Sequence, residues 1–102
     1  MPLSLAAAAP PLQDGDQFAA IEIGSNRFHM VVARYTLGQL RVVDRLRETV
    51  RMADGLDGKG GISSAARQRG LECLARFGQR IRDIPSLRVR AACSILTPIR
   101  WR

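Results

Sequence analysis

Apolar and polar residues alternate along the first half of the chain in a pattern that predicts three strands. Residues 18–23 are apolar apart from one acid, which is typical of a buried strand. Residues 28–34 are rich in β-forming residues and predict a second strand, and residues 40–52 predict a third. Glycine-containing turns at 24–26 and 37–39 separate the strands. Connections this short predict an antiparallel meander.

The third predicted strand carries a regular alternation of side chains. One face is expected to hold Leu40, Val42, Asp44 and Leu46. The other face is expected to hold Val43 and Arg45. A ladder of basic residues follows the same segment and consists of Arg41, Arg45, Arg47 and Arg51. Alternate members would share a face, where they either guide a polyanion or protect an edge strand from pairing.

The second half of the chain predicts one helix and one further strand. Residues 53–61 contain four glycines and predict a loop, after which Ser63 is expected to cap a helix that ends near residues 84–85. Apolar residues recur at helical spacing and are Gly70, Leu71, Leu74, Phe77, Gly78 and Ile81. A solvated side is expected to hold Arg69, Arg76 and Arg80. Residues 87–93 predict a parallel fourth strand, so the order is β-β-β-α-β and the fold class is α/β.

The basic charge of the chain bears on the expected ligand more than on the expected fold. Sixteen Lys and Arg against nine Asp and Glu give a net charge of +7, and fifteen of the sixteen basic residues are Arg. The forked guanidinium group suits phosphate oxygens, so a polyanionic partner is one interpretation. The other interpretation is a generally arginine-rich surface without a ligand.

Cysteine usage and hydropathy argue against two other classes of protein. Cys73 and Cys93 form no CxxC pair and have no companion histidine cluster, so a zinc site is not expected. Unpatterned cysteines fit a reducing cytoplasm. No apolar run approaches the ~20 residues of a membrane helix, so an integral membrane protein is not expected. Residues 1–16 are expected to form a flexible leader, with a signal peptide as the alternative.

The candidate chemistry lies at the end of the first predicted strand, where Glu22 is followed closely by Gly24, Ser25 and Asn26. Glycine lets the backbone approach a ligand, and successive backbone N–H groups in such a turn bind anions. The Ser and Asn side chains add donors, and the acid could hold Mg2+ through water. The alternative is a plain hairpin turn with Glu22 directed to solvent.

The same residues resemble a known family of phosphatases. Residues 18–34, FAAIEIGSNRFHMVVAR, resemble the first phosphate motif of the Ppx/GppA family, which reads strand, Asp-x-Gly-Ser-Asn-Ser, and a strand with Phe-His-Met. Residues 38–83 look like the continuation of the same proteins, and the similarity covers residues 17–91. The resemblance implies a partial first lobe of the actin-like, ribonuclease-H-like ATPase fold.

The resemblance also implies an activity and a set of site residues. The reaction would be exopolyphosphatase-type hydrolysis of the terminal phosphoanhydride of inorganic polyphosphate, or of guanosine pentaphosphate, with Mg2+ as cofactor. By motif match, Gly24, Ser25, Asn26 and Arg27 would contact phosphate and Glu22 would take the metal position. The general base of the family lies downstream of the matching residues, so no catalytic residue is assigned. Full-length relatives are expected to be homodimers in the cytoplasm, with peripheral membrane association as the alternative.

Three departures from the family pattern affect these expectations. Glu22 stands where the family has Asp, and Arg27 stands where it has Ser or Thr. After residue 91 the chain does not follow the second phosphate loop of the family, Val-Gly-Thr-x-x-Leu-Arg. Residues 17–91 are therefore expected to be a partial N-terminal phosphatase domain, and residues 92–102 a divergent tail read out of frame. A truncated chain of this kind is expected to be inactive by itself.

Two other functions stay open on the sequence alone. A sugar-kinase-like or actin-like nucleotide binder also places an acid and a glycine turn between its first two strands. A small basic nucleic-acid-binding module would bind in a salt-dependent way without Mg2+. The chain has no helix-turn-helix pattern and few aromatic residues for stacking, so a nucleic-acid partner is not expected. His29 and Cys73 are expected to pack within the fold rather than to react.

Overall fold

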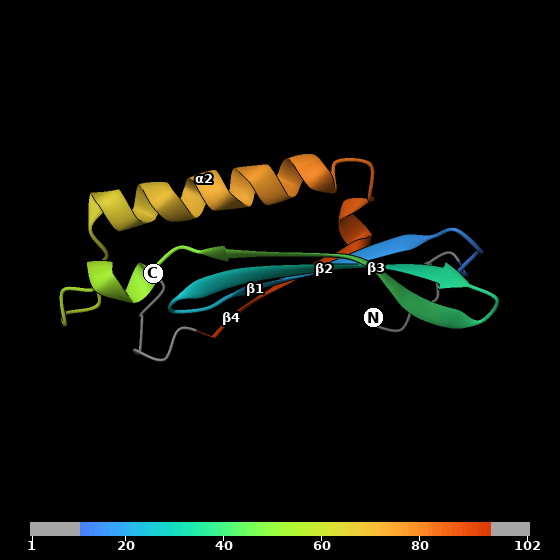
Figure 1. The fold of residues 1–102 in the computed structure, drawn as a ribbon, viewed down its shortest axis with the longest axis horizontal. Coiled ribbons are helices and arrows are strands. Elements are labelled where there is room, and N and C mark those ends of the chain that lie inside the picture. The colour runs from blue at the N-terminus through green and yellow to red at the C-terminus, as the bar shows by residue number, and fades with distance from the viewer. Residues whose placement is uncertain (1–10, 95–102) are drawn as a thin grey trace, which may run out of the picture.

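Four strands form one mixed sheet in the order β3-β2-β1-β4 (Figure 1). The computed structural model describes residues 11–94. Strands β1 (Gln17–Ile23), β2 (Arg27–Thr36) and β3 (Gln39–Thr49) are antiparallel neighbours, and β4 (Val89–Cys93) lies parallel to β1. The predicted element order, the meander and the parallel fourth strand are therefore confirmed.

One α-helix, α2 (Ser64–Arg80), covers one face of the sheet. The short 3-10 helix η1 (Met52–Gly55) joins β3 to α2, and η2 (Ser86–Arg88) precedes β4. Ser63 caps α2 as predicted, because its Oγ accepts a hydrogen bond from the backbone N–H of Ala66 at 3.2 Å. Among residues 11–94, no helix is long and apolar enough to cross a membrane.

Apolar side chains of the sheet and of α2 form the core between these two layers. The buried members are Ala19, Phe28, Met30, Val32, Val50, Met52, Ala66, Cys73, Phe77, Ile81 and Ile84. Within the described residues, no helix or strand covers the opposite face of the sheet, which lies below the strands in Figure 1. Strand β1, which the sequence predicted to be buried, is therefore buried on one side only, and Ala20 is exposed on the other.

The buried face of α2 differs from the predicted one. The structure buries a stripe with the spacing of an ideal helix, consisting of Ala66, Gly70, Cys73, Phe77 and Ile81. Leu71 is 51% exposed, and Gly78 is exposed as well, although both were predicted on the buried face. The helix also ends at Arg80, four residues earlier than predicted. The early end allows a turn, in which Ile84 N donates to Ile81 O, and this turn brings both isoleucines into the core.

A β-bulge in β3 contradicts the predicted alternation of that strand. Val32 pairs with Asp44 and the next residue, Ala33, pairs with Val42, so Val43 is the extra residue. Because paired residues share a face of the sheet, the bulge moves the residues before it to the opposite face. Leu40 and Val42 consequently lie on the open face, whereas Asp44 and Leu46 face α2.

The arginines predicted to be a solvated side of α2 are instead tied to other parts of the chain. Arg76 binds both carboxylate oxygens of Glu48, at 3.0 and 2.6 Å, and Arg80 pairs with Asp44 at 2.8 Å. Both acids follow the bulge and lie on the face of β3 that is turned toward α2, because they pair with Val32 and Phe28. The hydrogen bond from Arg76 holds the pKa of Glu48 below its ordinary value. The arginine of each pair is exposed, so solvent screens the attraction and each pair adds little to stability.

The turn before β1 is anchored to the β2–β3 hairpin. The backbone N–H of Gly15 donates to Tyr35 O at 2.8 Å, and the N–H of Leu37 donates to Asp14 Oδ1 at 3.0 Å. Residues 1–10 of the predicted leader and residues 95–102 of the predicted tail lie outside the described part of the chain.

The two cysteines are expected to differ in reactivity toward a thiol reagent. Cys73 is fully buried as predicted, and burial raises the pKa of its thiol from 9.0 to about 11. Cys93 is exposed. At about pH 8 we expect one thiol to react in the folded chain and two in urea, because the thiolate is the nucleophile. Rapid reaction of both thiols in the folded chain would contradict this placement.

The raised pKa of the Cys73 thiol makes the free energy of unfolding depend on pH above about 9. Between pH 9 and 11 the unfolded thiol ionises while the folded thiol stays protonated. The stability that is present below pH 9 is therefore lost as the pH rises through this range.

Candidate functional site

The turn between β1 and β2 lies at one end of the sheet, at the left in Figure 1, and contains the residues of the predicted phosphate motif. The backbone N–H of Gly24 donates to Arg27 O at 3.1 Å and closes the turn. A Cβ atom on residue 24 would lie 2.7 Å from that same carbonyl oxygen. The chain therefore needs glycine here because the backbone passes too close for any side chain.

The backbone carbonyl groups of this turn are occupied by the segment that follows β3. Asn26 O accepts hydrogen bonds from the N–H groups of Val50 and Arg51, both at 2.8 Å. Ser25 O accepts one from the N–H of Ala53 at 2.9 Å. These bonds direct the acceptors of the turn inward, toward η1.

The backbone N–H groups of the same turn are left available. Among residues 11–94, no hydrogen-bond acceptor is found for the N–H of Ser25 or of Asn26. Successive N–H groups in a turn that lack an acceptor suit an anion. The peptide groups of Ser25 and Asn26 thus have their acceptors used, while their donors lack a partner among the described residues.

All five predicted site residues line one shallow hollow of about 450 Å3. Its lining consists of Glu22, Gly24, Ser25, Asn26, Arg27, His29 and Ser94. Glu22 is exposed and pairs across the sheet with His29, so both side chains lie on the open face. The N–H of Ser94 donates to Ile23 O at 2.9 Å, which brings the end of β4 to the same place.

Two residues of this hollow were not predicted to belong to a site. His29 is half-buried at the hollow rather than packed in the core. It lies beside Glu22 because of the register between β1 and β2. The sequence did indicate that His29 shares a face with Arg27, since side chains alternate between the two faces of a strand. Ser94 follows a strand distant in sequence, and no local pattern could have identified it.

The donor set of the hollow fits a hydrated Mg2+ but not a closed metal site. Within the described residues, no group of three or more His, Cys, Asp or Glu side chains could hold a metal ion. Glu22 offers a single carboxylate beside the free N–H groups. Mg2+ commonly binds one or two carboxylates and takes its remaining ligands from water and phosphate oxygens. Glu22 would be the residue that holds it, together with a bound phosphate.

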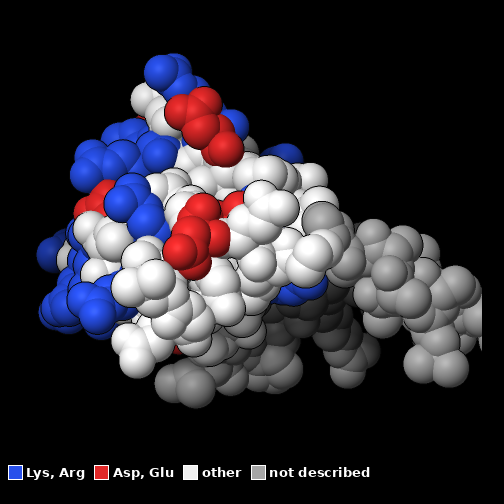
Figure 2. All heavy atoms as spheres, turned by 90° about the vertical axis from the view of Figure 1, so that its right-hand side faces the viewer, with Lys and Arg blue, Asp and Glu red and all other residues white. Residues whose placement is uncertain are grey.

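A group of unpaired arginines extends the site along the open face. Arg47 pairs with His29 and Arg45 pairs with Val31, so both share this face with Arg27. No acidic side chain of residues 11–94 forms a salt bridge with any of the three. Of the predicted basic ladder, Arg45 and Arg47 lie on the open face. Arg41 lies on the other face because of the bulge, and Arg51 follows the end of β3. The wider surface is also basic, and Figure 2 shows Lys and Arg gathered along one side of the end that carries the β2–β3 turn.

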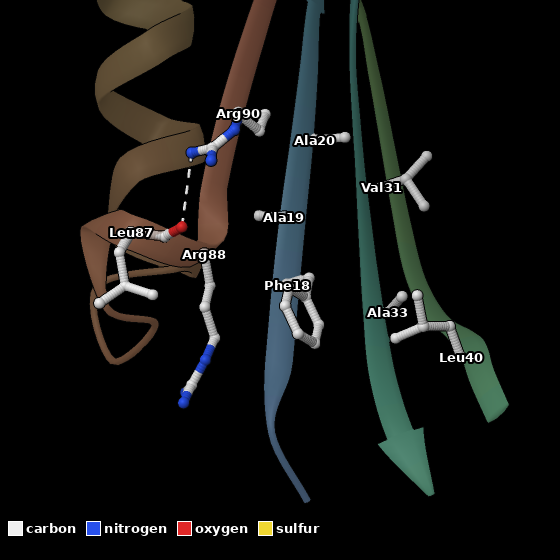
Figure 3. A pocket seen from close by; sticks show the side chains of 9 residues that line it. All are labelled: Phe18, Ala19, Ala20, Val31, Ala33, Leu40, Leu87, Arg88 and Arg90. Carbon is white, nitrogen blue, oxygen red and sulfur yellow. Dashed lines mark hydrogen bonds between the residues drawn. The ribbon is translucent and has the colours of Figure 1, made fainter. Parts of the chain in front are cut away.

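A second hollow, of about 360 Å3, lies farther along the open face and is apolar (Figure 3). Phe18, Val31 and Leu40 are among the residues that line it. The guanidinium of Arg88 at its rim is already used, because it pairs with Asp16 at 3.2 Å and lies 5.9 Å from the centre of the Phe18 ring. This hollow offers no convergent polar groups, so the candidate site is the turn at the other end of the sheet.

Comparison with known proteins gives a family match. Residues 31–96 match the model of the Ppx/GppA phosphatase family. The chain is also 43% identical over 82 residues to the guanosine-5'-triphosphate,3'-diphosphate pyrophosphatase of Vibrio atlanticus (strain LGP32). That alignment covers 80% of this chain and 16% of the relative, so the chain spans about a sixth of the relative's length.

Solved structures show the same fold at low sequence identity. A Ppx/GppA enzyme of Aquifex aeolicus matches with a TM-score of 0.67 and 19% identity over 76% of this chain and 26% of that chain. An exopolyphosphatase of Cytophaga hutchinsonii matches with a TM-score of 0.65 and 20% identity over 78% of this chain and 25% of that chain. The sheet and α2 thus form part of the first lobe of an actin-like fold, as expected from the sequence.

Proposed function

Because this chain belongs to the Ppx/GppA phosphatase family, we propose that its β1–β2 turn binds the terminal phosphate of a phosphoanhydride substrate. The whole enzyme would hydrolyse that anhydride in inorganic polyphosphate or guanosine pentaphosphate. The observation that carries the proposal is that the N–H groups of Ser25 and Asn26 have no acceptor among residues 11–94, whereas the carbonyl groups of the same two residues are occupied. Fixed donors of this kind stabilise phosphoryl oxygens without rearranging during the reaction.

Each residue of the hollow has a role under this proposal. Gly24 allows the close backbone turn, and Ser25 and Asn26 donate to phosphate oxygens from the backbone and the side chain. Arg27 adds a charged donor beside them. Glu22 would hold Mg2+, which neutralises charge on the phosphate oxygens when it is bound. Glutamate keeps the charge of aspartate and has a side chain one methylene longer.

The arginines of the open face support a substrate with several phosphate groups. Arg45 and Arg47 extend from the turn along β3, and neither is neutralised by a salt bridge within residues 11–94. A chain of phosphates held at its end by the turn would meet this basic surface. Both inorganic polyphosphate and guanosine pentaphosphate present such a chain.

The 102 residues alone are proposed to bind phosphate without turning over the anhydride. Residues 17–91 would act as a partial domain, and residues 92–102 as a divergent tail. Water activation needs a general base, and the family resemblance implies that this base lies downstream of the matching residues. The complete enzyme is proposed to be a cytoplasmic homodimer.

A titration of the isotope-labelled chain with inorganic tripolyphosphate tests the proposal. The backbone N–H signals of Ser25 and Asn26 should shift on binding, and the shifts should weaken when EDTA replaces Mg2+. The N–H of Ala66, which is bonded to the helix cap, serves as the internal control and should not move. Unchanged signals at the turn would overturn the binding site, and steady release of orthophosphate would overturn the proposed lack of turnover.

A further inference from the structure

The side chain of Arg69, on α2, spans from the helix to the backbone beside the phosphate turn. Its Nε donates to Val50 O at 2.9 Å, and its Nη2 donates to Arg51 O at 3.0 Å. The N–H groups of Val50 and Arg51 both donate to Asn26 O. One guanidinium group is therefore linked to the turn through two adjacent residues of backbone.

The backbone that Arg69 contacts has an uncommon conformation. Arg51 has φ 57° and ψ 51°, which is the left-handed region that residues other than glycine seldom adopt. Such a residue persists where its surroundings determine its conformation, and such places are often close to functional sites. Here the surroundings are the two hydrogen bonds from Arg69 on one side and Asn26 O on the other.

The geometry points to Arg69 as a positioning residue for the phosphate turn. By fixing the carbonyl groups of Val50 and Arg51, it holds their N–H groups against Asn26 O. That carbonyl is thereby kept engaged, while the N–H groups of Ser25 and Asn26, which have no acceptor among residues 11–94, remain available to a phosphate. Arg69 itself contacts no substrate in this arrangement. The expected effect of Arg69 on phosphate binding rests on the proposed function. The link between Arg69 and the turn can be measured without any ligand.

The type of side chain matters for this role. Arg76 and Arg80 of the same helix bind carboxylates, whereas Arg69 binds two backbone carbonyl groups with one planar fork. A lysine at position 69 would keep the charge but could not reproduce both bonds in one geometry. Arg69→Lys should therefore hold the turn, and support phosphate binding, less well than arginine does.

The experiment compares Arg69→Met and Arg69→Lys with the matched control Arg80→Met. Each methionine variant removes one exposed arginine of α2 that contacts another segment, but Arg80 lies at the opposite end of the helix from Arg69 and pairs with Asp44. Two quantities are measured for each variant: hydrogen exchange of the Val50 and Arg51 N–H groups, and affinity for inorganic tripolyphosphate. Exchange of Ala66 N–H reports the general stability of the helix start.

In Arg69→Met we expect both N–H groups to exchange roughly tenfold faster and the affinity to fall roughly tenfold, as expected from the loss of charge-assisted hydrogen bonds. Arg69→Lys should fall between this variant and the wild type, and Arg80→Met should match the wild type in both quantities. Equal changes in the Arg69 and Arg80 variants would overturn the inference, because Arg69 would then act through general stability.

If the wild type binds no tripolyphosphate, the proposed function fails, and hydrogen exchange alone decides the role of Arg69. If Arg69→Met does not fold, Arg69→Lys is compared with Arg80→Met in the same way.

Discussion

Replacing Phe77 by alanine is expected to remove a large part of the stability of the chain. Phe77 has no exposed surface and belongs to the stripe by which α2 packs on the sheet. Truncating a buried phenylalanine typically costs about 3–5 kcal/mol, through lost burial and the cavity that remains. Small domains have roughly 5–15 kcal/mol in total, and here the described residues build one helix layer on one sheet. Urea unfolding followed by circular dichroism at the helix signal measures the effect.

Leu71→Ala is the matched control for this prediction. Leu71 lies on the same helix and is also a large apolar residue, but it is 51% exposed. Its truncation should cost less than about 1 kcal/mol, since surface substitutions have small effects. If the two variants lose equal stability, the orientation of α2 on the sheet is not the one described.

Replacing Gly24 by alanine is expected to weaken phosphate binding strongly with only a moderate loss of stability. The new Cβ would lie 2.7 Å from Arg27 O, the acceptor of the hydrogen bond that closes the turn. The turn must open to relieve this contact, and its free N–H groups then no longer converge. We expect the affinity for tripolyphosphate to fall by at least roughly tenfold, which corresponds to about 1.4 kcal/mol of binding free energy. Calorimetric titration measures the change.

Gly78→Ala is the control for the chemical change itself. Nothing lies within 4 Å of a Cβ built on Gly78, which is on the exposed side of α2. Alanine there should stabilise the chain by about 0.5–1 kcal/mol, because it favours the helix and restricts the unfolded chain. Binding should be unchanged. Wild-type affinity in the Gly24 variant would mean that the β1–β2 turn is not where phosphate binds.

Local patterns were sufficient to predict the elements and the position of the turn. The apolar strands, the Gly24 turn and the Ser63 cap depend on residues close together in sequence, and each is present as predicted. The candidate site was predictable for the same reason, because Glu22 and residues 24–27 are nearly contiguous. Their common hollow follows from the shortness of the connection between two paired strands.

Other features depend on pairing between distant segments. The bulge at Val43 arises from the register of β3 on β2, and strand alternation alone predicted a different face for Leu40 and Val42. The contacts of Arg76 and Arg80 depend on the same pairing, since the register with β2 places Glu48 and Asp44 on the face turned toward α2. A solvated arginine and one paired with a distant acid look the same in a single sequence.

The polarity of the phosphate turn is also a property of the assembled fold. A Gly-Ser-Asn turn predicts N–H groups near a ligand, but it does not say whether the carbonyl groups or the N–H groups face outward. That orientation is decided when the backbone of Val50, Arg51 and Ala53 occupies the carbonyl groups, with Arg69 holding this segment from α2. Neighbouring residues along the chain thus determine which backbone shapes are accessible, whereas hydrogen bonds between segments distant in sequence select the one that leaves its donors free.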